Sequence, residues 1–213
     1  MKIFIGHDSK YPQATAVCMK SIRDNGFTGH IDILDKKELK TKSIYNRQDI
    51  KRESTECSFT RFYVPLLANY EGIAMFCDND FLWRCNPEEL LSYLKDNDIA
   101  VVKHKDYEAT GTKMDGVKNK SYPRKNWSSL VIYNCSKLKH LTKDYLDKAS
   151  PSELHELRWA ETIGSIPIEY NCLVGHYECS DAKALHYTNG GPWFDKYKNK
   201  EKSLAWWTVY ENL

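Results

Sequence analysis

The sequence predicts an α/β domain with a mixed, mainly parallel sheet flanked by helices. Short apolar runs, each long enough for one buried strand, alternate with stretches that carry helix-start signals. The 213 residues suffice for one substantial core, so we expect a single domain over residues 1–213, either as a whole protein or as the first domain of a longer chain. Apolar residues make up 41% of the chain and charged residues 28%, which is typical of globular proteins.

Six apolar runs have the length expected of strands. They span residues 2–6, 30–34, 72–76, 99–103, 129–133 and 183–187, and residues 166–168 are expected to be extended. Residues 36–57 are polar with weak periodicity and predict a loop with a short helix. Residues 105–126 are polar, contain glycine and predict a long surface loop.

Helices are predicted between these runs. They span residues 12–24, 59–69, 87 onward, 136–146 and 152–163, and a helix-like segment ends the chain. Ser9 and Ser152 can cap the first and fifth of these helices. Asn86 followed by Pro87 is a helix start, because Pro is favoured at the first helical position. Pro65 must lie in the first turn of its helix or kink it.

Two carboxylates follow the third strand. Asp78 and Asp80 come directly after the apolar run over residues 72–76, with no basic residue beside them. Ligands of an open α/β sheet bind beyond the carboxyl ends of its strands. Paired acids there are costly unless a cation lies between them, and the simplest such cation is a divalent metal that carries a phosphorylated substrate. The sequence therefore predicts a Mn²⁺ or Mg²⁺ site at Asp78 and Asp80.

A second Asp-x-Asp occurs at Asp96-Asn97-Asp98. It precedes an apolar run instead of following one, so it lies at the amino end of a strand. Asp and Asn are ordinary turn residues, and this copy predicts a solvated turn.

Further polar residues are expected at the same edge as the acids. His7 and Asp8 end the first strand, and they form either a nucleotide contact or a helix-capping turn. Tyr11 either stacks on a base or packs internally. Arg61 lies in an apolar stretch and needs a partner if buried, which predicts either a site role beside Asp78 or a structural ion pair. His186 closes the last short strand and is either a metal ligand or a satisfied core residue.

A glycine turn follows the late histidine. Asn189, Gly190 and Gly191 precede Pro192-Trp193. Glycines allow the backbone to approach a ligand closely, and consecutive N–H groups in such a turn can bind phosphate. Two carboxylates and one imidazole on a metal leave positions open for two phosphate oxygens, so this turn is expected to bind a diphosphate.

Charge and cysteine usage exclude several classes of protein. The formal net charge is +2, so no field favours nucleic acid or a membrane surface. The sequence contains no run of about twenty apolar residues, so it predicts no membrane-spanning helix. The seven cysteines lack Cys-x-x-Cys spacing, which favours a reducing, cytoplasmic location and argues against structural zinc. Nothing in the sequence indicates the oligomeric state.

Two of these motifs, taken together, resemble those of a known enzyme family. A strand ending in Asp-Asn-Asp and a late His before a Gly-Pro-Trp turn resemble GT-A glycosyltransferases, particularly the retaining family-8-like group that includes glycogenin and bacterial galactosyltransferases. The resemblance covers nearly the whole chain, from Lys2 to about Trp193. The chain also looks like the capsid-glycan transferases that large algal viruses encode, which would place it in the host cytoplasm.

The resemblance implies roles for individual residues. The metal ligands would be Asp78, Asp80 and His186, with Mn²⁺ or Mg²⁺ as the cation. Arg61 would contact the donor sugar and phosphate. The residues that would contact UDP and the sugar are His7, Asp8, Tyr11, Asn79, Asn126, Trp127, Ser128, Asn189, Gly190 and Gly191.

Two departures from the family pattern affect this assignment. The family often has a Lys before the late Pro-Trp that binds the diphosphate, and here that place is Gly191. Backbone N–H groups, or Lys196 or Lys198, would have to substitute. The family's Asp-Gln pair is also missing, and Glu161 is the nearest acid, so it is counted with Arg61 and Asp80 as a catalytic candidate.

The predicted function is transfer of a hexose or 6-deoxyhexose from a UDP-sugar to a glycan or protein-linked acceptor, with retention implied by the resemblance. Two other classes stay open. One is a phosphotransferase with Asp78 as its aspartyl nucleophile. The other is a non-catalytic carbohydrate-binding module, which the six Trp and fourteen Tyr would suit.

Overall fold

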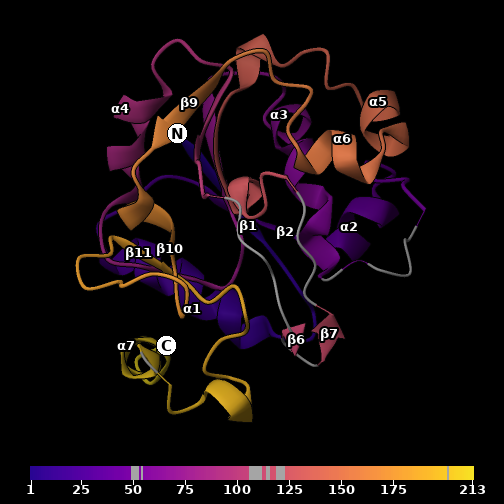
Figure 1. Cartoon of the computed structure of the whole chain (residues 1–213). Helices are drawn as coiled ribbons and strands as arrows, with labels where there is room; N and C mark the ends of the chain where they lie inside the picture. Colours follow the sequence, from indigo (N-terminus) through magenta and orange to yellow (C-terminus); the bar gives the residue numbers. More distant parts are fainter. Residues whose placement is uncertain (49–52, 54, 106–111, 114–115, 119–122, 201) are drawn as a thin grey trace.

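A six-stranded sheet runs through the centre of the molecule, and helices cover both of its faces (Figure 1). The computed structural model describes residues 1–48, 53, 55–105, 112–113, 116–118, 123–200 and 202–213. In spatial order the strands are β2 (Ile31–Leu34), β1 (Lys2–Gly6), β3 (Ile73–Cys77), β8 (Leu130–Asn134), β5 (Ile99–Val102) and β9 (Ile163–Ile166). A three-stranded sheet contains β10 (Cys172–Leu173), β11 (Ala184–His186) and β4 (Phe81–Trp83). A two-stranded sheet contains β6 (Thr112–Lys113) and β7 (Val117–Lys118).

Seven α-helices and seven 3₁₀ turns connect the strands of the described residues. The α-helices are α1 (Pro12–Asp24), α2 (Lys36–Thr41), α3 (Val64–Leu67), α4 (Leu91–Leu94), α5 (Lys143–Lys148), α6 (Pro151–His155) and α7 (Ser203–Tyr210). The 3₁₀ turns are η1 (Glu56–Ser58), η2 (Thr60–Tyr63), η3 (Pro87–Leu90), η4 (Trp127–Ser129), η5 (Cys135–Lys137), η6 (Ile168–Asn171) and η7 (Asp195–Tyr197).

The direction of the strands confirms the predicted mixed, mainly parallel sheet. β1 pairs in parallel with β2 and β3, and β5 pairs in parallel with β9. Only β8 in this sheet runs antiparallel to its neighbours β3 and β5. As a result, β1, β3 and β5 all end at the same edge of the sheet, where a ligand of such a fold is expected.

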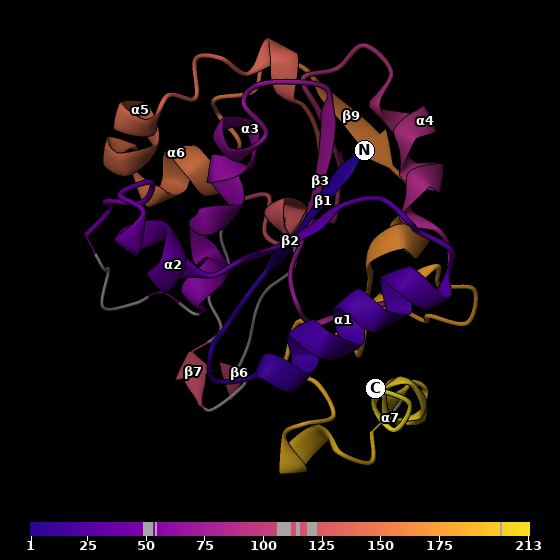
Figure 2. The same cartoon turned by 180° about the vertical axis from the view of Figure 1, so that it is seen from behind.

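Side chains of the central strands alternate between two cores, one on each face of the sheet. In β3, Ala74 and Phe76 belong to the core under α2, α3, α5 and α6, whereas Met75 and Cys77 belong to the core under α1 and α4 (Figures 1 and 2). All four side chains are fully buried. Because both faces of β3 are covered, the chain must leave the core before it can present a charged group, and it does so at Asp78.

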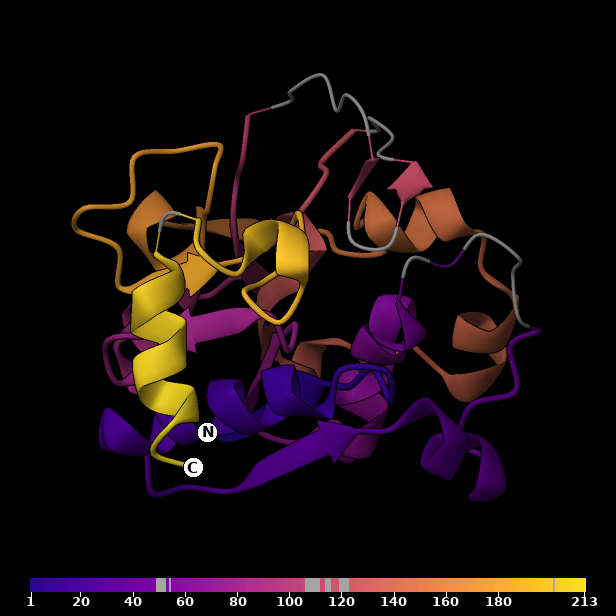
Figure 3. The ribbon, with the colours of Figure 1, turned by 90° about the horizontal axis from the view of Figure 1, so that it is seen from below.

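The C-terminal segment packs against the first helix. Viewed from below, α7 lies beside α1 (Figure 3), and Trp206 of α7 is buried in a third apolar cluster with Val17 of α1. The helix-like end that the sequence predicts is therefore a packed part of the fold.

The predicted strands are all present with ends within two residues, but several helix predictions are wrong. Ser9 does not cap α1; its N–H and hydroxyl donate hydrogen bonds to Glu56. The predicted helix over residues 136–146 is replaced by η5 and α5, because Thr142 caps a new helix there. The predicted helix over residues 152–163 is only α6, capped by Ser150; left-handed Leu157 (φ 55°) ends that segment and residues 163–166 form β9.

Two further findings bear on the predictions about location. Cys172 and Cys179 form a disulfide, whereas the sequence predicts reduced cysteines throughout. The other five cysteines are free thiols. Within the part of the chain that the structure describes, every helix is too short or too polar to cross a membrane. Of the predicted long loop over residues 105–126, residues 106–111, 114–115 and 119–122 lie outside the described residues, and the described part contains β6 and β7.

Candidate metal centre

Asp78 and Asp80 lie where the central strand β3 leaves the core. The backbone N–H of Asp78 donates to the carbonyl of Ser129 (3.0 Å), the last residue of η4 just before β8. Asp80 directly precedes β4, and its carbonyl accepts from the N–H of Tyr187 (2.9 Å). The acid pair is thus held from both sides, by a neighbouring strand and by the segment that carries the late histidine.

His186 reaches the acids through the small sheet. β11 pairs antiparallel with β4 so that His186 lies opposite Phe81, and the imidazole stacks on the Phe81 ring (4.5 Å between centroids). This places His186 Nε2 3.3 Å from Asp80 Oδ1. One ligand atom from each of Asp78, Asp80 and His186 lies within 4.8 Å of the others, and this is the only such group among the described residues. The predicted three-residue set therefore converges.

The chemistry of this donor set fits a small divalent cation. Carboxylate oxygens suit Mg²⁺ and Mn²⁺, and a neutral imidazole is compatible with Mn²⁺. His186 is 2% exposed and Asp80 is 7% exposed. Burial raises the pKa of Asp78, and the nearby Asp80 raises it too, whereas Arg61 opposes both. Bringing two acids together out of water is unfavourable, and a bound cation would offset that cost.

Arg61 is a buried partner of the acid pair. Its Nη2 lies 2.7 Å from Asp78 Oδ1, and its Nη1 donates to the carbonyl of Ser128 (2.8 Å). The guanidinium also lies over the ring of Phe76 (5.0 Å to the centroid) and donates from Nε to the Cys57 carbonyl (3.3 Å). The predicted pairing of Arg61 with Asp78 is confirmed, and it holds one carboxylate of the site in a fixed orientation.

The end of β1 joins the acid loop through Thr15 of α1. His7 Nδ1 lies 2.9 Å from the Thr15 hydroxyl, and Asn79 Nδ2 donates to the same hydroxyl oxygen (3.2 Å). Asp8 accepts from the N–H of Lys10, as expected of a turn. Tyr11 packs on Phe194 (4.8 Å between centroids). His7 and Asn79 are therefore joined beside the acid pair, whereas Asp8 and Tyr11 each have a structural partner.

The stretch before β8 borders the metal centre. Ser128 is 4% exposed and its carbonyl binds Arg61, whereas the Asn126 side chain accepts from the Thr188 hydroxyl (3.4 Å), two residues after His186. Trp127 donates from its indole N–H to the carbonyl of His104 (2.9 Å). These contacts tie residues 126–128 to both halves of the donor set.

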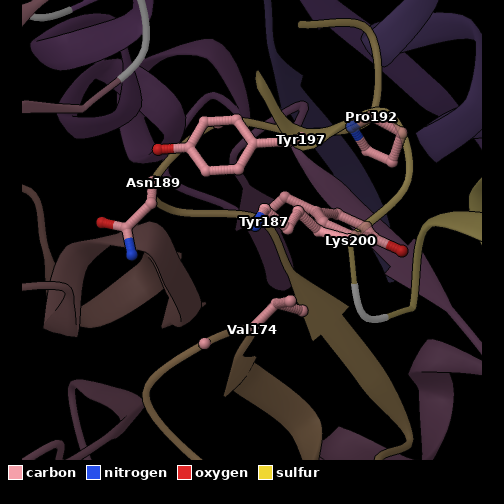
Figure 4. A pocket seen from close by; sticks show the side chains of 8 residues that line it. Val174, Tyr187, Asn189, Pro192, Tyr197 and Lys200 are labelled. Carbon is pink, nitrogen blue, oxygen red and sulfur yellow. The ribbon is translucent and has the colours of Figure 1, made fainter. Parts of the chain in front are cut away.

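The glycine turn only partly matches its predicted role. Gly190 has φ 119°, but its N–H donates to the Tyr187 carbonyl (2.8 Å) and is already engaged. A pocket of about 280 Å³ opens on this turn (Figure 4). It is lined by Val174, Gly175, Tyr187, Asn189, Gly190, Pro192, Tyr197 and Lys200. The lysine at this pocket is therefore Lys200, and Lys196 and Lys198, which the sequence suggests, are not among its lining residues.

Glu161 and the second Asp-x-Asp lie at the opposite edge of the sheet. Asp98 Oδ2 accepts from the N–H groups of Glu161 and Thr162, next to the starts of β5 and β9. The predicted solvated turn is confirmed at Asp96, whose side chain is 99% exposed, whereas Asp98 is 8% exposed and is a buried connection between strands. Glu161 itself is exposed and far from the acid pair along the strands, so its assignment as a catalytic candidate is not supported.

Three residues near the site, Asn171, Ser129 and His104, escape sequence reasoning. Asn171 is fully buried, and its side chain contacts both His186 and Ser129. His104 follows β5 and is 2% exposed; burial lowers the pKa of its imidazole to about 3, so it is neutral. Each stands alone in an apolar or irregular stretch, and only the pairing of distant strands brings it to the metal centre.

Comparisons with known proteins are consistent with this geometry. No family model matches the chain. Protein CDI of Arabidopsis thaliana is 40% identical over 217 residues, covering 96% of this chain and 84% of that protein. An active-site mutant of LgtC superposes with a TM-score of 0.61 at 12% identity, covering 100% of this chain and 96% of LgtC. GlyE of Streptococcus pneumoniae TIGR4 gives a TM-score of 0.61 at 15% identity, covering 98% of this chain and 60% of GlyE.

A further structure of LgtC, a galactosyltransferase in complex with donor and acceptor sugar analogs, gives a TM-score of 0.59 at 12% identity, and GlyE is a glycosyltransferase. At identities this low, the likeness concerns the fold alone. The predicted GT-A architecture is confirmed.

Proposed function

The chain belongs to the family of Protein CDI of Arabidopsis thaliana, and we propose that it is a metal-dependent glycosyltransferase with a UDP-sugar as donor. The group transferred is a hexose or 6-deoxyhexose, the acceptor is a glycan or a protein-linked sugar, and the anomeric configuration is retained, as in the family-8-like group. The observation that carries the proposal is the convergence of Asp78, Asp80 and His186 at the carboxyl edge of a GT-A sheet.

The proposed metal ligands are these three side chains, with Mn²⁺ or Mg²⁺ as the cation. When bound, the cation would neutralise the charge that develops on the diphosphate leaving group and would orient it. Arg61 keeps Asp78 in place through its 2.7 Å ion pair, so the carboxylate does not have to reorganise when the donor binds. No general base is required for retention, since the departing phosphate can accept the proton of the acceptor hydroxyl.

The remaining predicted contacts are assigned by their position around the centre. His7, Asp8, Tyr11 and Asn79 lie at or near the ends of β1 and β3 and are proposed to bind uridine. Asn126, Trp127 and Ser128 are proposed to shape the sugar pocket, and Asn189, Gly190 and Gly191 to lie along the diphosphate. Catalysis then comes mostly from positioning and electrostatic stabilisation.

A donor screen tests this proposal. UDP-hexoses and UDP-6-deoxyhexoses are incubated with the protein, with and without Mn²⁺, and release of UDP is measured. We expect slow hydrolysis of at least one donor that depends on Mn²⁺ and is lost in Asp80→Ala. Binding of UDP that is independent of metal and unaffected by Asp80→Ala would contradict the site assignment.

The two alternative functions gain no specific support. An aspartyl nucleophile would need a reactive carboxylate, whereas Asp78 is held by Arg61 and is also approached by the Cys57 thiol (3.6 Å). A carbohydrate-binding module has no need for a buried set of two acids and an imidazole. Formation of a stable phospho-aspartate analogue at Asp78 would revive the first alternative.

A further inference from the structure

We propose that Asn171 and Ser129 are positioning residues that hold the His186 imidazole as its Nδ1–H tautomer, with the Nε2 lone pair directed at the acid pair. The inference rests on the proposed function only in naming the cation. A chain of hydrogen bonds, whose direction is set at one end by a backbone carbonyl, fixes this tautomer.

The chain begins at the carbonyl oxygen of Asn126, which can only accept hydrogen bonds. The Ser129 hydroxyl lies 2.7 Å from this oxygen and must therefore donate its single proton to it. The Ser129 oxygen is left with lone pairs, so any further partner has to be a donor. Ser129 is 2% exposed, which leaves little room for water to replace that partner.

Asn171 is the donor that Ser129 requires. Its Nδ2 lies 2.9 Å from Ser129 Oγ, and this contact fixes which end of the amide faces which neighbour. The opposite end, Asn171 Oδ1, lies 2.8 Å from His186 Nδ1. An amide oxygen can only accept, so the imidazole carries its proton on Nδ1.

The remaining imidazole nitrogen, His186 Nε2, then has a lone pair. It lies 3.3 Å from Asp80 Oδ1, and stacking on Phe81 restricts the plane of the ring. Two lone pairs that face each other at this distance repel, unless a cation lies between them. The tautomer set by Asn171 is therefore the one that a metal requires, because a metal-bound imidazole uses a nitrogen without a proton.

Ser129 connects both halves of the donor set. Its hydroxyl acts on His186 through Asn171, and its carbonyl accepts from the N–H of Asp78 (3.0 Å). The neighbouring carbonyl, that of Ser128, binds Arg61, which holds the Asp78 carboxylate. One short segment just before β8 thus orients the acid and the imidazole, although they come from distant points of the sequence.

The first test needs no variant. We expect ¹⁵N NMR of the histidine side chains in the metal-free wild-type protein, recorded at alkaline pH so that the imidazoles are neutral, to show a protonated Nδ1 and an unprotonated Nε2 for His186, assigned by loss of its signals in His186→Gln. A proton mainly on Nε2, or an equal mixture of tautomers, would overturn the inference. Because no metal is present, this result stands apart from whether the protein is a glycosyltransferase.

The second test compares two substitutions of similar size. Asn171→Leu removes the acceptor for Nδ1–H, and we expect Mn²⁺ affinity, measured by electron paramagnetic resonance, to fall about 10- to 100-fold. Asn171→Asp keeps an oxygen acceptor at the same place, and the Ser129 hydroxyl can turn to donate to it. We expect that variant to bind Mn²⁺ within about threefold of wild type, as carboxylate–histidine–metal arrangements do.

A matched control separates positioning from general damage. Asn97→Leu removes an asparagine whose amide binds the Leu94 carbonyl at the opposite edge of the sheet, and it should leave Mn²⁺ affinity unchanged. Equal Mn²⁺ affinity of folded Asn171→Leu and wild type would refute the proposal. So would an Asn171→Asp variant as weak as Asn171→Leu. If the wild-type protein binds no Mn²⁺ while the His186 tautomer is as expected, the proposed function fails and the positioning role of Asn171 stands.

Discussion

Removal of the Arg61 guanidinium should expose how strongly the fold depends on this buried cation. Arg61 is 6% exposed and its ion pair with Asp78 spans 2.7 Å. In Arg61→Met an apolar chain of similar length replaces the guanidinium. The substitution leaves Asp78, which is 16% exposed, without its nearest positive charge, and the Ser128 carbonyl without its 2.8 Å donor.

The expected cost follows from the burial of that pair. Breaking a buried ion pair by removing one partner destabilises by about 3–5 kcal/mol, because an uncompensated charge stays behind. If the uncompensated charge is the cause, Asp78→Asn should relieve most of it. We therefore expect the double variant Arg61→Met/Asp78→Asn to be at least about 1 kcal/mol more stable than Arg61→Met, with a coupling of about 2 kcal/mol.

The assay is urea unfolding of the four proteins of this cycle in metal-free buffer containing a chelator. The free energies of unfolding give the coupling directly. A loss below about 1 kcal/mol in Arg61→Met, or a double variant less stable than the single one, would refute the view that Arg61 compensates the acid charge. Asp78→Asn on its own serves as the control for the amide substitution.

Three further predictions concern stability. Burial lowers the pKa of His104 and His155 to about 3, so below pH 6.5 the unfolded chain takes up protons that the folded chain does not. The free energy of unfolding should fall by up to about 1.4 kcal/mol per pH unit for each histidine as the pH decreases, and a urea series on His155→Gln without a reduced slope would contradict this. Gly190→Ala places a Cβ 2.8 Å from the Tyr197 ring at φ 119°, and it should lower the free energy of unfolding by about 1–3 kcal/mol; an unchanged melting temperature would show the strain to be absent. Cys172→Ser opens the disulfide and should cost about 2 kcal/mol, and equal urea midpoints with the wild type under oxidising conditions would exclude that contribution.

Five of the six strands of the central sheet could be predicted from the sequence because each is a short apolar run between turn residues, whereas β9, which contains Gly164 and Ser165, could not. The apolar runs at Ile73–Cys77 and Leu130–Asn134 have no polar residue in their interior, and the ends of each run set the limits of the strand. The antiparallel direction of β8 could not be predicted, since apolar content carries no information on pairing. Helix limits failed where side chains compete, as at Thr142, which caps α5 in the middle of a predicted helix.

The site could be predicted where residues lie next to strand ends. Asp78, Asp80 and His186 each follow or close a strand, and the antiparallel pairing of β11 with β4 brings His186 to the edge where β3 ends. Asn171 and Ser129 could not be found in this way, because their roles depend on contacts between η6, η4 and β11. The narrower likeness to the capsid-glycan transferases of algal viruses stays a prediction, as does a cytoplasmic location.

The most direct test of the account is an anomalous-scattering map from a crystal grown with Mn²⁺ and UDP. We predict one manganese peak bound by carboxylate oxygens of Asp78 and Asp80 and by His186 Nε2, with the diphosphate of UDP completing its coordination. Bound UDP with no manganese at these residues, or manganese held elsewhere while His186 stays apart, would contradict the account.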